Sequence, residues 1–117
     1  MDVSTKLYFD EDLFNFFGGY FHQDWNVDDP TWEAVIERYL SEEGHSKAEL
    51  LSVKIGNILS LVTDDTLLFN IINSEFGCYY WPGSIEAMRS WLQQVIIVLC
   101  AEAANPAFKR DALKRAP

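Results

Sequence analysis

Apolar residues recur at three- and four-residue steps in five stretches of the chain, which is the spacing of one face of a helix. The first stretch covers about residues 10–22 and begins with three acidic residues, which suit the positive end of a helix dipole. Its apolar positions would cover more than half of the helix surface, so we expect this helix to lie at the centre of the domain. These positions are Phe14, Phe16, Phe17, Tyr20 and Phe21.

Two adjacent glycines, Gly18 and Gly19, stand in the middle of this first helix. Together they should cost about 1.5–2 kcal/mol relative to alanines, because glycine loses the most backbone freedom in a helix. A sequence tolerates such a cost more readily where another element must approach the backbone closely. We therefore expect a close contact at the glycine pair.

A second helix is predicted to start at Asp29, which can cap it, with Pro30 at the first helical position. Glu33 and Glu37 lie off its apolar stripe and are expected to face solvent. Gly44 should end this helix as a left-handed cap. The stripe consists of Trp32, Val35, Ile36, Tyr39 and Leu40.

Three further helices follow from their start signals. Ser46 and Glu49 form a capping box for the third helix, Asp64 or Asp65 can cap a shorter fourth helix, and Ser84 can cap the fifth. The fifth helix carries a wide apolar stripe and should be heavily buried.

The segment CYYWPG, residues 78–83, predicts an aromatic loop, since Pro82 keeps the preceding residue out of helical geometry. No run shows sustained two-residue alternation. The sequence therefore predicts an all-α fold: one domain over residues 1–117, a helical bundle of about five helices with its core at about residues 10–105 and a basic tail at 106–117.

The composition is that of one soluble globular domain: 117 residues, of which 49% are hydrophobic. The longest apolar run, residues 95–101, is far shorter than the roughly 20 residues needed to cross a bilayer. The N-terminal segment lacks the pattern of a secretory signal. Cys78 and Cys100 match no metal or redox spacing, so we expect two buried thiols in a cytoplasmic protein, not a disulfide.

The negative charge is confined to the first half of the chain. Residues 1–50 hold 12 acidic and three basic residues, whereas residues 51–117 hold six of each, so the first half carries the whole net charge of −9. One side of a compact domain should then have a negative potential that attracts a basic partner. The same potential repels nucleic acid, which excludes a nucleic-acid-binding role.

The candidates for chemistry are few. His22, Asp24, Glu33 and Glu37 could supply metal ligands or an acid and base pair, but no metal-binding motif supports them. The serines, cysteines and histidines form no nucleophile signature. We therefore expect no catalytic residue, no metal and no cofactor, and His22 is interpreted as a hydrogen-bonded residue that fixes a helix end.

Three runs carry a resemblance to a known family: GGYFHQDW at residues 18–25, GCYYWPG at residues 77–83, and the pair Trp91 and Leu92. In these runs the chain resembles the small immunity proteins of bacterial contact-dependent growth inhibition systems. The resemblance covers about residues 13–99. It departs from the family pattern at Trp81, where an acidic residue often stands in the family.

The resemblance implies a cytoplasmic antitoxin that binds and blocks the C-terminal toxin domain delivered by a neighbouring cell, commonly a nuclease, and that is not an enzyme. A signature shared by the family is expected to be scaffold, so Tyr20, Phe21, His22 and Trp25 should hold the first two helices together. The specific contacts with a basic toxin domain should come from exposed acids. These are Asp24, Asp28, Asp29, Glu33, Glu37, Glu42 and Glu43. If these acids do not form the contact surface, the aromatic loop at Tyr79, Tyr80 and Trp81 is the next candidate.

Two other functions remain open on the sequence alone. One is a small metal-dependent hydrolase that uses His22, Asp24, Glu33 and Glu37. The other is an adaptor for an unrelated basic protein.

Overall fold

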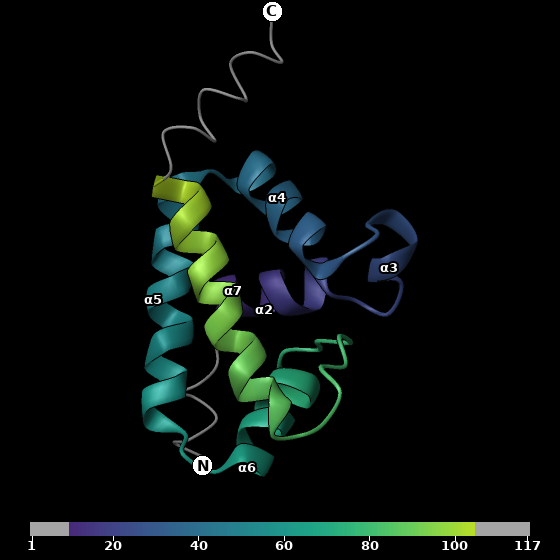
Figure 1. Ribbon diagram of the computed structural model, residues 1–117, viewed down its shortest axis with the longest axis vertical. Helices are drawn as coiled ribbons and strands as arrows, with labels where there is room; N and C mark the ends of the chain where they lie inside the picture. The colour runs from purple at the N-terminus through teal and green to yellow at the C-terminus, as the bar shows by residue number, and fades with distance from the viewer. Residues whose placement is uncertain (1–9, 105–117) are drawn as a thin grey trace, which may run out of the picture.

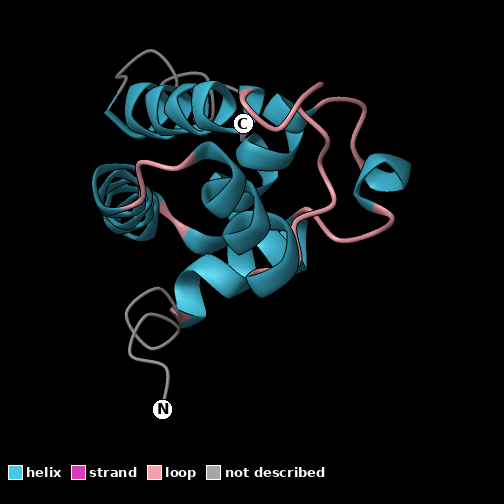
Figure 2. Cartoon of the chain, turned by 90° about the horizontal axis from the view of Figure 1, so that it is seen from below, coloured by secondary structure: helices cyan, strands magenta, loops and turns pink. Residues whose placement is uncertain are grey.

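The computed structural model describes residues 10–104, apart from the side chains of Asp28 and of residues 101–104. Every regular element among these residues is a helix, and no strand occurs among them (Figure 2), which confirms the all-α prediction. The elements are α2 (Glu11–Phe14), η1 (Asn15–Tyr20), α3 (Trp25–Asp28), α4 (Trp32–Glu43), α5 (His45–Leu61), α6 (Asp65–Asn70), η2 (Ile71–Glu75) and α7 (Ala87–Ala104), where η denotes a π-helix.

The two longest helices, α5 and α7, pack side by side and form one wall of the molecule, while α4 lies beside their upper part (Figure 1). The α2–η1 segment lies against α5 at its start and against α4 at its end. Its rings at Phe16, Phe17 and Phe21 are fully buried, so the first segment is central as the sequence predicted. Phe14 is a different case, since it lies largely exposed.

The first segment is not one regular helix. Asp10 caps α2, where its Oδ1 accepts hydrogen bonds from the backbone N–H of Asp12 at 2.9 Å and of Leu13 at 3.3 Å. After one turn the chain widens into the π-helix η1. A π-helix is rare and shifts the side-chain register relative to an α-helix. The adjacent residues Phe16 and Phe17 are both buried as a result, and Phe14 turns outward.

The glycine pair has one close contact. A Cβ atom on Gly18 would lie 2.7 Å from the backbone oxygen of Phe76, whereas a Cβ atom on Gly19 would meet nothing within 4 Å. The prediction of close approach is therefore confirmed at Gly18 and wrong at Gly19. The approaching element is the end of η2, and the Phe17 and Phe76 rings stack there with centroids 6.1 Å apart.

The predicted start of the second helix is wrong by about two residues. Thr31 is the N-cap of α4, and its Oγ1 accepts a hydrogen bond from the Ala34 N–H at 3.2 Å. Asp29 instead lies extended after α3, a short helix that the sequence did not predict. Its carboxylate binds the side chain of Arg38, so it is not available to cap the helix.

The other start signals have mixed outcomes. Asp64 caps α6 through the Leu67 N–H at 2.9 Å, and Ser84 accepts a hydrogen bond from the Ala87 N–H at 3.0 Å at the start of α7. The capping box at residues 46–49 is wrong. Gly44 alone joins α4 to α5, with φ 94° and ψ 166°, so α5 already begins at His45. The positive φ confirms the need for glycine, but the ψ value is extended and not left-handed helical.

The two cysteines differ in exposure. Both are free thiols, but Cys78 is buried and Cys100 is exposed, so the expectation of burial is wrong for Cys100. Burial raises the pKa of the Cys78 thiol to about 12. Within the described part of the chain, no helix has both the length and the apolar character that crossing a bilayer requires. The predicted basic tail at residues 106–117 lies outside the described residues.

Candidate functional site

The basic side chains between residues 10 and 100 are all engaged in ion pairs. Lys54 lies 2.9 Å from carboxylate oxygens of both Asp10 and Asp12, and Arg89 lies 2.8 Å from Asp65. Arg38 pairs with Asp29 and Lys47 with Asp12. This stretch holds four basic and 15 acidic residues, a formal charge of −11, so most of its carboxylates have no cation to pair with.

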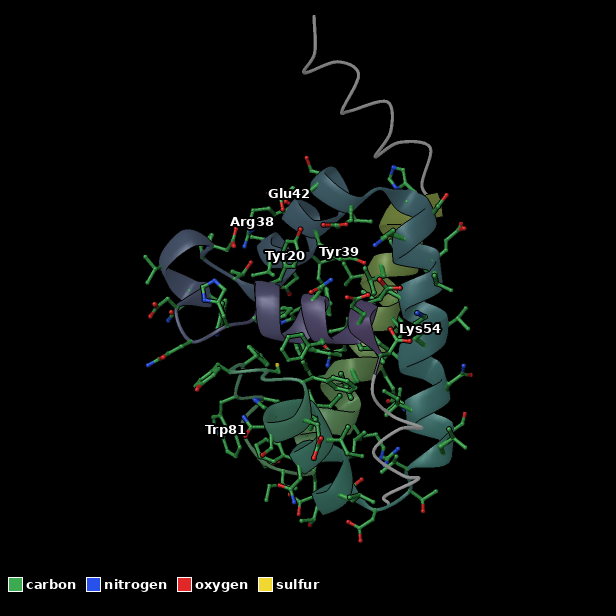
Figure 3. The ribbon with its side chains drawn as sticks, turned by 180° about the vertical axis from the view of Figure 1, so that it is seen from behind. Tyr20, Arg38, Tyr39, Glu42, Lys54 and Trp81 are labelled. Atoms are coloured by element: carbon green, nitrogen blue, oxygen red, sulfur yellow. The ribbon has the colours of Figure 1, made fainter. Side chains whose placement is uncertain are left out.

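Part of the acidic half has a structural task on α4. Arg38 donates to one oxygen of Asp29 from Nε at 3.1 Å and from Nη2 at 2.9 Å. The hydroxyl of Tyr20 donates to Oε1 of Glu42 at 2.6 Å and lies 3.3 Å from Oε2 of Glu43 (Figure 3). Burial and the neighbouring glutamates raise the pKa of Tyr20 above its ordinary value, so the hydroxyl stays protonated and acts as the donor. The contacts of Tyr20 join η1 to α4, whereas the Arg38–Asp29 pair ties α4 to the residue that follows α3.

The contacts of Asp29 overturn one expectation about the surface. Its side chain is only 11% exposed, because the guanidinium of Arg38 covers it. The prediction that Asp29 is an exposed acid is therefore wrong. Glu42 and Glu43 are exposed but already bonded to Tyr20, and they also lie near Arg38 and Lys47 at 3.8 and 3.9 Å.

Three of the predicted contact acids remain exposed, with no ion pair among the described residues. Glu33 and Glu37 lie one turn apart on the solvent side of α4, and Asp24 lies just before α3. The side chain of Asp28 lies outside the described set. Glu11 on α2 and Glu49 on α5 are also exposed with no ion pair among the described residues, but only Glu33 and Glu37 lie one turn apart on the same helix.

The aromatic signature residues have different neighbours from those expected. Tyr20 packs on Tyr39 with ring centroids 5.1 Å apart, so this residue does connect the first segment to α4, as expected. Phe21 instead meets Trp91 of α7 edge to face at 5.3 Å, and Trp25 lies 5.7 Å from Tyr80. His22 makes a local bond, in which its Nδ1 accepts from the Asp24 N–H at 3.1 Å.

Residues 10–99 match a family model whose description is CdiI immunity protein. The chain belongs to the CdiI immunity protein family. No curated protein and no solved structure matches it. The matched span runs from the cap of α2 almost to the end of α7, and it includes all three runs that carry the sequence resemblance.

Family membership states the general role of the chain. It is an immunity protein of a contact-dependent growth inhibition system, and its partner is the cognate toxin.

The residues of the hydrolase alternative do not form a metal centre. Across residues 10–100, no three histidine, cysteine, aspartate or glutamate side chains lie close enough together to hold a metal ion. His22 and Asp24 are neighbours through the backbone bond described above, but Glu33 and Glu37 do not join them in such a group. No structural observation therefore favours the hydrolase.

The sequence makes the aromatic loop at Tyr79, Tyr80 and Trp81 the next candidate contact surface after the acids, but it does not show which of these rings are exposed. Cys78 is buried and Tyr80 half-buried, whereas Tyr79 and Trp81 are both exposed. This alternation is typical of extended backbone, in which successive side chains point to opposite sides. The segment CYYW followed by proline is compatible with this alternation of inward and outward side chains. Four residues are too few to distinguish such an alternation from chance without the fold.

Proposed function

We propose that this CdiI-family protein neutralises a basic toxin domain of the nuclease class by covering it with the exposed carboxylates of Asp24, Glu33 and Glu37. It acts in the cytoplasm and catalyses no reaction. One observation carries the proposal: every basic side chain between residues 10 and 100 is paired within the fold, while these carboxylates are exposed and have no ion pair among the described residues.

The chemistry of a nuclease explains why such a surface would suit it. A protein that binds the phosphates of nucleic acid does so with lysine and arginine side chains. Exposed carboxylates are complementary to such a groove, and their summed field speeds association by long-range steering. A nuclease whose groove is covered in this way cannot admit its substrate.

Three of the seven acids expected to contact the toxin are already engaged within the fold. Asp29 is covered by Arg38, and Glu42 and Glu43 help to hold η1 on α4, so replacing these residues would disturb the fold as well as the surface. Glu33 and Glu37 have no such task among the described residues. Asp28 stays in the proposed contact set on the strength of the sequence.

The test uses the double variant Glu33→Lys with Glu37→Lys. The partner is the toxin domain encoded by the neighbouring gene, and binding is measured by calorimetry at several salt concentrations, alongside the protection of cells that express the toxin. A buried charge pair that loses one partner typically costs about 2–5 kcal/mol, so binding should weaken at least about 30-fold and protection should be lost.

The matched control is Glu49→Lys with Glu75→Lys, which changes the net charge by the same amount at two exposed positions on other elements. The control should bind with nearly unchanged affinity. Glu33 lies in the first turn of α4, where a lysine costs roughly 0.3–1 kcal/mol of stability, so both proteins are melted first. If the Glu33 and Glu37 variant binds as tightly as the wild type, or no more weakly than the control, the carboxylates of α4 are not the contact surface.

A further inference from the structure

The loop between η2 and α7 presents two large aromatic side chains to solvent. Tyr79 and Trp81 are each 57% exposed, although the residues beside them, Cys78 and Tyr80, point inward. Pro82 keeps Trp81 out of helical geometry, and in extended backbone residues two positions apart lie on the same side. The two exposed rings therefore share one side of the loop.

The loop is firmly anchored. The Tyr79 N–H donates to the Phe21 oxygen at 2.8 Å, and the Cys78 N–H donates to the Ile72 oxygen at 3.1 Å. The side-chain amide of Asn73 donates to the Cys78 oxygen at 2.8 Å, and the Tyr80 ring stacks on Trp91 with centroids 4.4 Å apart. A partner that binds these rings would lose little entropy in ordering the loop, which favours affinity.

Packing within the fold does not account for the outward rings. Trp81 touches the ring of Phe69 edge to face at 5.6 Å but leaves more than half of its surface in water. The Tyr79 ring takes part in no aromatic pair among the described residues. A single exposed apolar residue is ordinary on a protein surface. Two large rings held on the same side of an anchored loop are typical of a binding surface, where tryptophan and tyrosine dominate the affinity.

The loop is continuous with the acidic surface. Tyr80 lies 5.7 Å from the ring of Trp25 in α3, and Trp32, at the start of α4, lies 5.9 Å from Trp91, on which Tyr80 stacks. Burial and, next, the negative charge of Glu33 raise the pKa of Tyr80, so the field of that carboxylate reaches the loop. The loop and α3 project on the same side of the molecule (Figure 1), and Trp81 lies at that edge (Figure 3).

We propose that Tyr79 and Trp81 are part of the toxin-binding surface and receive arginine or lysine side chains of the toxin on their exposed ring faces. This inference rests on the proposed function, because it takes the basic toxin as the partner. A cation over an aromatic face is attracted by the ring quadrupole, and the apolar stem of arginine or lysine covers the ring edge. The exposed carboxylate of Glu33, on the adjoining helix α4, complements the same positive charge.

The experiment measures the Kd for the same purified toxin domain by calorimetry. Tyr79→Ala and Trp81→Ala remove the rings, and Trp81→Phe keeps a smaller ring. Ile97→Ala, at a position 64% exposed on α7, is the control for loss of an exposed apolar side chain. We expect Trp81→Ala to raise the Kd at least about 30-fold, the level of a hot-spot residue, and Trp81→Phe to recover part of the loss. The control should stay within about 2-fold.

Tyr79→Ala tests the loop independently, in case Trp81→Ala has a folding defect. The anchoring bond at Tyr79 uses its backbone N–H, which alanine keeps, so this variant should melt near the wild type and still bind at least about 10-fold more weakly. Raising the salt should shrink the defect of Glu33→Lys with Glu37→Lys far more than that of Trp81→Ala, because ring contacts are only weakly screened.

The outcomes separate the two proposals. If the wild-type protein does not bind the toxin domain, the proposed function and this inference both fall. If the wild type binds, the Glu33 and Glu37 variant loses binding, and Tyr79→Ala and Trp81→Ala both bind like the Ile97→Ala control, only the role of the loop is overturned.

Discussion

Replacing each glycine of the pair at positions 18 and 19 with alanine should change stability in opposite directions. Both glycines lie in the π-helix η1 and both have negative φ, so neither needs glycine for its backbone conformation. What differs is the space around the missing Cβ. At Gly18 it would lie 2.7 Å from the oxygen of Phe76, and at Gly19 it would lie in open space.

The magnitude follows from two terms. Alanine gains about 1 kcal/mol over glycine in a helix, and this is the whole effect expected at position 19, where we predict a gain of about 0.5–1 kcal/mol. At position 18 the same gain is opposed by overpacking, which costs about 1–3 kcal/mol. The upper end applies because the contact is with backbone, the Phe76 ring is fully buried, and the Phe76 N–H is bonded to the Ile71 oxygen at 3.0 Å.

We therefore expect Gly18→Ala to lose about 2 kcal/mol and Gly19→Ala to gain somewhat less than 1 kcal/mol. For a domain of this size the two variants should differ in Tm by roughly 10 °C. Urea unfolding followed by circular dichroism gives the free energies directly. If Gly18→Ala is as stable as Gly19→Ala, the approach of η2 to η1 does not constrain the backbone, and the packing argument at the centre of the fold is wrong.

Two further predictions concern the ion pairs and the core. The hydrogen bond from Lys54 lowers the pKa of Asp12 in the folded protein. The stability that this ion pair contributes is therefore present above the unfolded pKa of about 3.9 and is lost as the pH falls through the lower, folded-state pKa of Asp12. Lys54→Met should flatten the decrease in urea stability between about pH 5 and pH 3, and a decrease as steep as that of the wild type would contradict the assignment. In the core, Trp91 is buried and its Nε1 has no hydrogen-bond partner among the described residues. A buried donor without a partner costs about 1–3 kcal/mol, and phenylalanine removes that donor while it keeps a ring. The unfolding free energy of Trp91→Phe should therefore stay within about 1 kcal/mol of the wild-type value, whereas Trp91→Ala should lower it by about 3–5 kcal/mol. Equal losses in the two variants would show that the indole N–H carries no penalty.

The sequence by itself determined where the longer helices lie and what family the chain belongs to. The stripe on α4, the caps at Asp64 and Ser84, and the glycine at position 44 all act within a few residues of themselves, so the local order of residues is enough to read them. The family runs at residues 18–25 and 77–83 are also local strings. They indicated an immunity protein before any packing was known.

Only the tertiary structure decided which acids are free. Asp29 reads in sequence as a helix cap with an exposed carboxylate, but Arg38, nine positions later, covers it. Tyr20 binds Glu42, which is 22 positions away, and no local pattern reports that bond. Whether a carboxylate is free for a partner depends on which cation or hydroxyl the fold brings to it, and this is a property of packing.

The same reason explains the glycine pair and the loop. Gly18 and Gly19 are equivalent in sequence, and only the arrival of Phe76 from a distant part of the chain distinguishes them. The segment CYYW reads as a loop, but its outward side is set by Tyr80 stacking on Trp91 and by the bond from Tyr79 to Phe21. Helix periodicity and caps arise from neighbours along the chain, whereas close approach and exposure arise from neighbours in space.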